Sequence, residues 1–288
     1  MPSHRRIPRL ALALSGGAAR GIAHVGVLRA LIENKIPIDC IAGTSAGSLV
    51  GGALASGMPL EDIQAIGSSL RWRDIGRMTM SRLGVQTNER LEQYLRSRLP
   101  KTRFEDLPIP LAVVATDLQS GRAVVMHDHG DVPFAIRASC AIPGWYVPVV
   151  DEAGRQLVDG GLVAMVPAQV ARAFDVDLVV AVDVNAEGAK FLAATSVIGI
   201  ILQSMMMVQT TATLHQLQLA DFVIKPRVGH IRWDEMTRAE ELMVAGYEAG
   251  QESIQGIRNL IEEATESAPR WYQFRRRRMA RPGGLRRE

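Results

Sequence analysis

The chain has 288 residues, enough for one large domain or two small ones, and its 47% hydrophobic and 22% charged residues are ordinary for a globular protein with a sizeable core. Two cysteines are too few for a disulfide framework, which fits a reducing compartment. The net charge of +3 arises in residues 269–288, which hold eight Arg and one Glu, while the rest of the chain is net acidic and contains nothing that resembles a nucleic-acid recognition module.

Alternating strands and helices are predicted from residue 9 onward. The apolar run Leu10–Leu14 predicts a buried first strand, because it is too short for a signal peptide and lacks a convincing cleavage site. A glycine-rich turn follows, and apolar residues at helical spacing then predict a helix over 22–34. A second strand over 36–42 leads into a helix of small residues over 48–56.

Residues 60–107 are predicted to form a mostly helical insertion. An N-cap at Thr87 or Asn88 would start a helix that runs to about Leu99, before Pro100. The insertion also sets apolar side chains among arginines, namely Trp72, Met78 and Met80. We therefore treat it as a candidate lid over an apolar pocket.

The rest of the chain continues the alternation. Strands are predicted over 111–116, 123–126, 156–158, 178–184 and 221–224, and helices over 133–139, 167–174 and 240–262. Near-continuous apolar strands separated by helices indicate an α/β fold of three layers, α/β/α, with a largely parallel central sheet. We expect an N-terminal extension over 1–8, one domain over 9–265 and a basic tail over 266–288.

The stretch from Phe191 to Ala220 has no charged residue at neutral pH. Ser, Thr and Gln residues interrupt its apolar character, whereas a membrane span needs about 20 mainly apolar residues. A long buried or interfacial helix is therefore predicted, in which Met205–Met207 suit adaptable packing against a core or a lipid chain.

Ser45 is the candidate nucleophile. It lies in the sequence GTSAG (residues 43–47), between a predicted strand and a predicted helix. A serine between two glycines on such a turn is how many hydrolases expose a reactive hydroxyl, and the helix N-terminus adds N–H groups and partial positive charge. An ordinary turn with a capping Ser or Thr is the alternative.

The first glycine-rich turn, from Ser15 to Gly21, is the candidate oxyanion hole. In a parallel sheet it lies at the same carboxyl edge as GTSAG, so the N–H groups of Gly17 and Ala18 could face the serine hydroxyl. Arg20 could support the loop or bind an anionic headgroup. The alternative is a dinucleotide-binding motif. That motif requires an acidic residue after the second strand, where this sequence has GTSAG.

The sequence offers two kinds of candidate for the general base that would activate Ser45. Asp159 precedes two glycines at the end of a predicted strand, where it is closely approachable, although aspartates are common in ordinary turns. A Ser–Asp–His order would instead require His215 or His230. These residues leave a Ser–Asp hydrolase, a Ser–His–Asp carboxylesterase and a catalytically silent lipid-binding protein as alternatives.

Taken in order, the glycine-rich turn, GTSAG and the DGG after Val158 resemble the bacterial patatin-like phospholipases. The segments GIAHVGVLRAL, IRASCAIPGWYVPV and LVDGGL are also similar to that family, and the likeness covers roughly residues 9–262. Two features depart from the family pattern. Ala18 stands where a third glycine is usual, and LVAMVP follows DGG where an Asn-Pro pair is common.

The resemblance implies a serine esterase that cleaves phospholipid or lysophospholipid esters through a Ser45–Asp159 dyad and an acyl-enzyme, with no catalytic histidine, metal or cofactor. It implies an oxyanion hole at Gly16, Gly17 and Ala18. Its supporting motif positions are Arg20, Gly21, Gly43, Gly47, Gly160 and Gly161. Burial in a dry acyl pocket would raise the pKa of the aspartate from its usual value of about 3.9 and make it a better base at pH 7.

The basic tail places Trp271, Tyr272 and Phe274 beside its arginines. It is predicted to be either a solvated end or a contact for anionic lipid headgroups. We expect a cytoplasmic protein, or one peripheral to the inner face of the membrane, with a phospholipid or lysophospholipid substrate and no nucleic-acid partner. The sequence predicts no oligomeric state.

Overall fold

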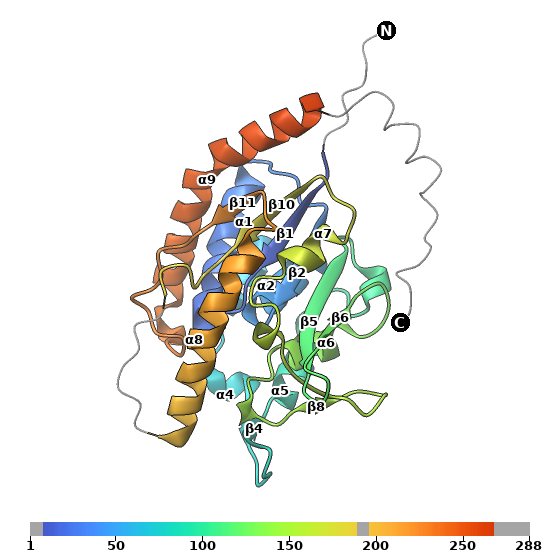
Figure 1. Ribbon diagram of the computed structural model, residues 1–288, viewed down its shortest axis with the longest axis vertical. Helices are drawn as coiled ribbons and strands as arrows, with labels where there is room; N and C mark the ends of the chain where they lie inside the picture. Colours follow the sequence, from blue (N-terminus) through green and yellow to red (C-terminus); the bar gives the residue numbers. More distant parts are fainter. Residues whose placement is uncertain (1–7, 189–195, 268–288) are drawn as a thin grey trace.

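The computed structural model describes residues 8–188 and 196–267, and Figure 1 shows a central sheet flanked by helices. Within these residues the main sheet has eight strands, in the order β11-β10-β1-β2-β5-β9-β8 with β6 paired to β5. Their bounds are β1 (Leu10–Leu14), β2 (Cys40–Thr44), β5 (Leu111–Asp117), β6 (Ala123–Met126), β8 (Val149–Val150), β9 (Gln156–Asp159), β10 (Leu178–Val182) and β11 (Phe222–Ile224). The strands from β11 to β5 are parallel, while β6, β9 and β8 are antiparallel to their neighbours, so the sheet is largely parallel as predicted.

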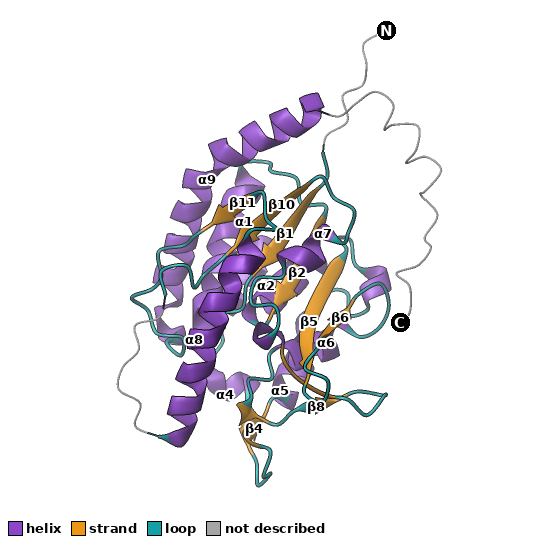
Figure 2. Ribbon diagram, in the orientation of Figure 1, coloured by secondary structure: helices purple, strands orange, loops and turns teal. Residues whose placement is uncertain are grey.

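Helices cover both faces of this sheet (Figure 2). They are α1 (Ala23–Glu33), α2 (Ala46–Ala55), α6 (Val132–Ser139), α7 (Ala168–Arg172), α8 (Val197–Leu217) and α9 (Ala239–Ser267), with short 3-10 turns η1 (Ala18–Ile22), η3 (Gly160–Leu162) and η4 (Met236–Arg238). One apolar core joins the sheet to α1, α2, α6 and α9, and a second joins its other face to α7 and the end of α8. The predicted three-layer α/β/α fold is confirmed.

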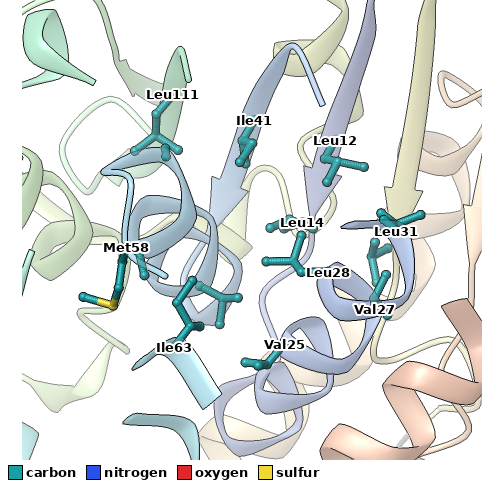
Figure 3. Close-up of a cluster of buried hydrophobic side chains, with 14 of the residues drawn as sticks. Leu12, Leu14, Val25, Val27, Leu28, Leu31, Ile41, Met58, Ile63 and Leu111 are labelled. Atoms are coloured by element: carbon teal, nitrogen blue, oxygen red, sulfur yellow. The ribbon is translucent and has the colours of Figure 1, made fainter. Parts of the chain in front are cut away.

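The alternation of side chains along β1 explains the two cores. Leu12 and Leu14 point toward α1 and belong to one apolar cluster with Val25 and Leu28, all of them at most 1% exposed (Figure 3). Successive residues of a strand point to opposite faces, so the alanines of β1 face the other layer. Their small size lets α7 lie close to the sheet.

Two boundaries near the candidate site differ from the prediction. The second strand begins at Cys40 rather than residue 36, because the Ile36 N–H donates to the Leu31 carbonyl at 2.9 Å and closes the end of α1. Helix α2 begins at Ala46 rather than residue 48. As a result a single residue, Ser45, separates β2 from α2.

The insertion over 60–107 is mostly helical, as predicted, but it also forms two strands that were not predicted. It contains α3 (Leu60–Ser69), α4 (Trp72–Ile75), α5 (Glu89–Arg98) and the 3-10 turn η2 (Phe104–Asp106), but also the strands β3 (Arg77–Met78) and β4 (Gly84–Thr87). These strands form a small sheet with the distant β7 (Gly144–Tyr146). Helix α5 begins after Asn88 as predicted, although the Asn88 side chain makes no cap bond and donates to the Arg137 carbonyl at 2.8 Å.

The predicted extension over 1–8 and the basic tail over 266–288 lie almost wholly outside the described residues. The uncharged stretch forms the predicted long helix as α8, 21 residues in length. Among the described helices, none combines the length and the apolar character that crossing a membrane would require.

Close packing between α1 and α9 gives a test of the fold. A Cβ on Gly26 would overlap the carbonyl oxygen of Met243, so the two helices pack backbone to backbone. We expect Gly26→Ala to lower the free energy of unfolding by about 1–3 kcal/mol, the usual cost of overpacking, in urea denaturation. Gly67→Ala is the matched control, because its Cβ would meet its nearest neighbours at 3.7 Å. Alanine's better helix propensity should stabilise that variant by up to about 1 kcal/mol, and equal losses in both variants would contradict the packing argument.

Candidate active site

Ser45 has a constrained backbone at the end of β2. Its φ of 50° and ψ of −122° are unusual for a residue with a side chain, and such strain persists only where the surroundings hold it. The Ser45 N–H donates to Ser139 Oγ at 2.8 Å, and the Ser139 hydroxyl donates to the Val114 carbonyl at 2.6 Å. The Ser48 hydroxyl donates to the Ser45 carbonyl at 2.6 Å. The turn is therefore fixed from both sides.

Asp159, the last residue of β9, faces this serine. The Ser45 hydroxyl donates to Asp159 Oδ2 at 2.6 Å, and the Gly161 N–H donates to Oδ1 at 2.8 Å. The Thr116 hydroxyl fixes the same turn by donating to the Asp159 carbonyl at 2.9 Å. Both carboxylate oxygens thus accept a hydrogen bond, and Asp159 is only 5% exposed.

Burial decides the protonation of this carboxyl group. It raises the pKa of Asp159 to about 6, because the low-dielectric surroundings disfavour the charged form. The hydrogen bonds from Ser45 and Gly161 act in the opposite direction, since both stabilise the carboxylate. The group is therefore ionised at pH 7 but is a stronger base than an ordinary aspartate.

The loop after β1 lies against the same site. The Gly16 N–H donates to the Met165 carbonyl at 2.9 Å, and Asn185 Nδ2 donates to the Gly16 carbonyl at 2.8 Å. Ala18 has a φ of 50°, the left-handed region in which the glycine usual at this position would be less strained. Within the described residues, the N–H groups of Gly17 and Ala18 donate to no acceptor, and both residues line the cavity beside Ser45.

Arg20 supports a neighbouring loop. It is 2% exposed, and its guanidinium donates to the carbonyls of Ile231 at 2.6 Å, Gly229 at 3.2 Å and Gly188 at 3.3 Å. These contacts tie the glycine-rich turn to the segments around Gly188 and Ile231, and Arg20 also lines the cavity beside Ser45.

The motif glycines allow backbones to approach. A Cβ on Gly47 would overlap the Leu14 carbonyl oxygen, and one on Gly160 would overlap that of Val114. The remaining motif glycines meet similarly close neighbours; they are Gly21, Gly43 and Gly161. These contacts hold the turns after β1, β2 and β9 against one another at the carboxyl edge of the sheet.

A cavity of about 160 Å³ opens above these turns. Its polar wall includes Ser45, Asp159 and the Gly16–Ala18 loop. Its apolar wall comes largely from α8, through Leu202, Met205, Met206, Leu214 and Leu217, with Ile142 from the loop before β7. The site therefore joins a serine and a carboxylate to a wall suited to a hydrocarbon chain.

The described histidines lie away from this cavity. His24 is buried, with Nε2 2.8 Å from the Ser15 carbonyl oxygen, and burial lowers its pKa to about 4. His215 is exposed on α8, and His230 pairs with Glu241 at 2.8 Å. Neither His215 nor His230 lines the cavity. In the described ranges, no three His, Cys, Asp or Glu side chains are grouped so as to hold a metal ion.

Three positioning residues, Ser139, Thr116 and Asn185, are missed by sequence reasoning. Their side chains bond to residues 94, 43 and 169 positions away, so no local motif singles them out. Ser139 does lie within the IRASCAIPGWYVPV segment that carries the family resemblance, which is the signal that could have found it.

Known proteins with similar sequences point to one family. An uncharacterized NTE family protein of Mycobacterium tuberculosis is 41% identical over 186 residues, which cover 63% of this chain and 51% of that protein. Lysophospholipase NTE1 of Mycosarcoma maydis is 38% identical over 184 residues, covering 61% and 10%. This chain thus spans about half the length of the first relative and about a tenth of the second.

The fold and the family agree. The crystal structure of VipD from Legionella pneumophila superposes with a TM-score of 0.52 at 16% identity, over 90% of this chain and 67% of that one, and shares the fold. A family model described as patatin-like phospholipase matches residues 12–172, more than half of the chain, including the turns that hold Ser45 and Asp159. The chain belongs to the patatin-like phospholipase family.

Proposed function

We propose that this protein is a serine esterase that cleaves the carboxylic esters of phospholipids or lysophospholipids, with Ser45 as nucleophile and Asp159 as general base. The observation that carries the proposal is the 2.6 Å hydrogen bond from the Ser45 hydroxyl to Asp159 Oδ2 inside a cavity with an apolar wall. A nucleophile and a base within hydrogen-bond reach are the recurring signature of such catalysis. Family membership and a relative named as a lysophospholipase support the lipid ester as substrate class.

The first half of the reaction forms an acyl-enzyme. Ser45 Oγ attacks the ester carbonyl carbon while its proton passes to Asp159 Oδ2. The carbonyl oxygen becomes an oxyanion, which accepts hydrogen bonds from the N–H groups of Gly17 and Ala18. Gly16 contributes the loop rather than a donor, because its own N–H is engaged with Met165. The bond to the leaving alcohol then breaks, and the alcohol oxygen takes the proton from Asp159.

The second half releases the fatty acid. A water molecule gives a proton to Asp159 and attacks the acyl carbon, after which the Ser45–acyl bond breaks and the serine regains its proton from Asp159.

Each preorganised oxyanion donor can contribute about 3–4 kcal/mol to transition-state stabilisation, and a positioned base can raise the rate by about 10²–10⁴-fold. The apolar side chains of α8 would hold the acyl chain and keep excess water from the intermediate.

Substitution of the two reacting residues tests the proposal. We expect Ser45→Ala to abolish measurable hydrolysis of a short-chain nitrophenyl ester, and Asp159→Asn to lower kcat/KM by about 10²–10⁴-fold, because the amide cannot accept the proton. Ser56→Ala and Asp117→Asn are matched controls, since both residues are buried and neither lines the cavity. Full activity in Asp159→Asn would contradict the dyad.

The raised pKa of Asp159 predicts the dependence of the rate on pH. The base works as the carboxylate, whose fraction grows with pH, so kcat/KM should rise through a midpoint near pH 6 and level off above it. The midpoint should move little with temperature, because the enthalpy of ionisation of a carboxyl group is small. The enthalpy of ionisation of an imidazole is large, so its pKa changes markedly with temperature. Kinetic profiles at two temperatures, over a pH range in which the fold is stable, make the measurement. A strongly temperature-dependent midpoint would favour a histidine base.

A further inference from the structure

The outer face of α8 has no role in the proposed hydrolysis. The inner face of this helix lines the cavity through buried residues such as Leu202, Gln209 and Thr213, each at most 8% exposed. The opposite face exposes a stripe of apolar side chains: Val197 at 73%, Ile200 and Ile201 at 55% each, Met207 at 51% and Val208 at 72%. The helix contains no Asp, Glu, Lys or Arg. Ser204, Thr211 and His215 are exposed on the same side, but a helix at a protein surface ordinarily turns many charged residues to water, so a face this rich in exposed aliphatic side chains is unusual.

A second exposed apolar element is the β3–β4 hairpin. Its exposed side chains are Met78 at 68%, Met80 at 101% and Leu83 at 57%. Arg77 and Arg82 are also exposed, and no acidic residue occurs between Ile75 and Asn88. Apolar side chains next to uncompensated arginines suit the boundary between lipid chains and anionic headgroups.

Both elements are connected to the cavity. Strand β4 pairs in register with β7, Gly84 opposite Gly144, and β7 begins two residues after Ile142 in the cavity wall. Helix α8 forms the apolar wall directly. In Figure 1 the first turns of α8 and the hairpin reach toward the same lower end of the molecule.

We propose that the outer face of α8 and the tip of the β3–β4 hairpin form a docking surface for a phospholipid bilayer, with α8 lying in the plane of the headgroups. The idea that substrate arrives from that bilayer rests on the proposed function; the docking itself does not. The helix is about 30 Å long, and with lipid against its outer face and the acyl chain against its inner face, both of its apolar sides would be covered.

A second copy of the chain is the less suitable occupant. In a two-fold dimer the same patch meets itself, so the arginines of two hairpins would enter one interface. The hairpin has no acidic residue to compensate them, and like charges brought together disfavour association. An anionic bilayer instead complements these charges.

Vesicle binding by the Ser45→Ala chain tests the proposal, because this variant leaves the lipid intact. Flotation with phosphatidylglycerol–phosphatidylcholine vesicles at about 1 M NaCl, where the Debye length is about 3 Å, screens the attraction of the arginine-rich tail together with that of Arg77 and Arg82, so that the variants report the apolar contact. We expect Ile201→Ser with Val208→Ser to lower the partition coefficient by about tenfold or more, since two exposed aliphatic side chains that the bilayer would bury are lost. Met80→Ser should lower it by a smaller factor, and serves as a second variant if the helix substitutions impair folding.

The control is Val244→Ser on α9, which removes an aliphatic side chain of similar exposure, 51%, from another element. It should leave binding unchanged. With Ser45 intact, Ile201→Ser with Val208→Ser should retain hydrolysis of a soluble nitrophenyl ester, so failed docking and failed catalysis are distinguishable. Undiminished vesicle binding by both the α8 and the hairpin variants would overturn the proposal. The proposal would also be overturned if the wild-type protein were a dimer, and if Ile201→Ser with Val208→Ser converted it to monomers without changing vesicle binding.

Discussion

The hydrogen bond between Ser45 and Asp159 constrains the whole site, because it partners a carboxyl group that is almost fully buried. Removing an ionised carboxylate from water is costly unless donors replace the lost solvent. The donors come from the turn after β2 and from the turn after β9, and both strands pair with β5 between them. The register of three strands therefore sets the distance between the Ser45 hydroxyl and the Asp159 carboxylate.

The backbone at Ser45 shows how the fold maintains a conformation that its local sequence disfavours. A residue held outside its preferred φ/ψ region costs about 1–3 kcal/mol. The hydrogen bond that the Ser45 N–H donates to the distant Ser139 and the one that its carbonyl accepts from Ser48 offset this cost, and close backbone contact at Gly47 leaves the turn little room to relax. The reactive hydroxyl is thus directed into the cavity by groups on β5, α6 and α2 rather than by the pentapeptide alone.

Much of this arrangement is readable from the sequence, and what is missed has one physical cause. The succession of strands and helices along the chain, the long uncharged helix and the candidate reacting residues follow from local patterns, since apolar runs and glycine turns report their own surroundings. The strands β3 and β4 depend on β7, more than 50 residues away, and 60–107 therefore looks mostly helical by its local sequence. Ser139 and Asn185 escape notice for the same reason: their partners are distant in sequence. The residues alone leave the proposed base open between Asp159 and the histidines, whereas the family resemblance already implies Asp159, the group whose carboxylate accepts the Ser45 hydroxyl in the structure.

The position of Ser45 and Asp159 and the shape of the cavity depend on different parts of the molecule. Close main-chain contacts fix the turns that carry Ser45 and Asp159, as at Gly47 against Leu14 and Gly160 against Val114. The apolar wall of the cavity, in contrast, is built largely from side chains on α8, and this helix contacts η3, the turn that follows Asp159. Mutations along that helix can reshape the cavity while the reacting atoms stay in place. In the proposed esterase, substitutions on α8 could therefore alter which acyl chain fits without moving Ser45 or Asp159, so selectivity and chemistry would be separately adjustable.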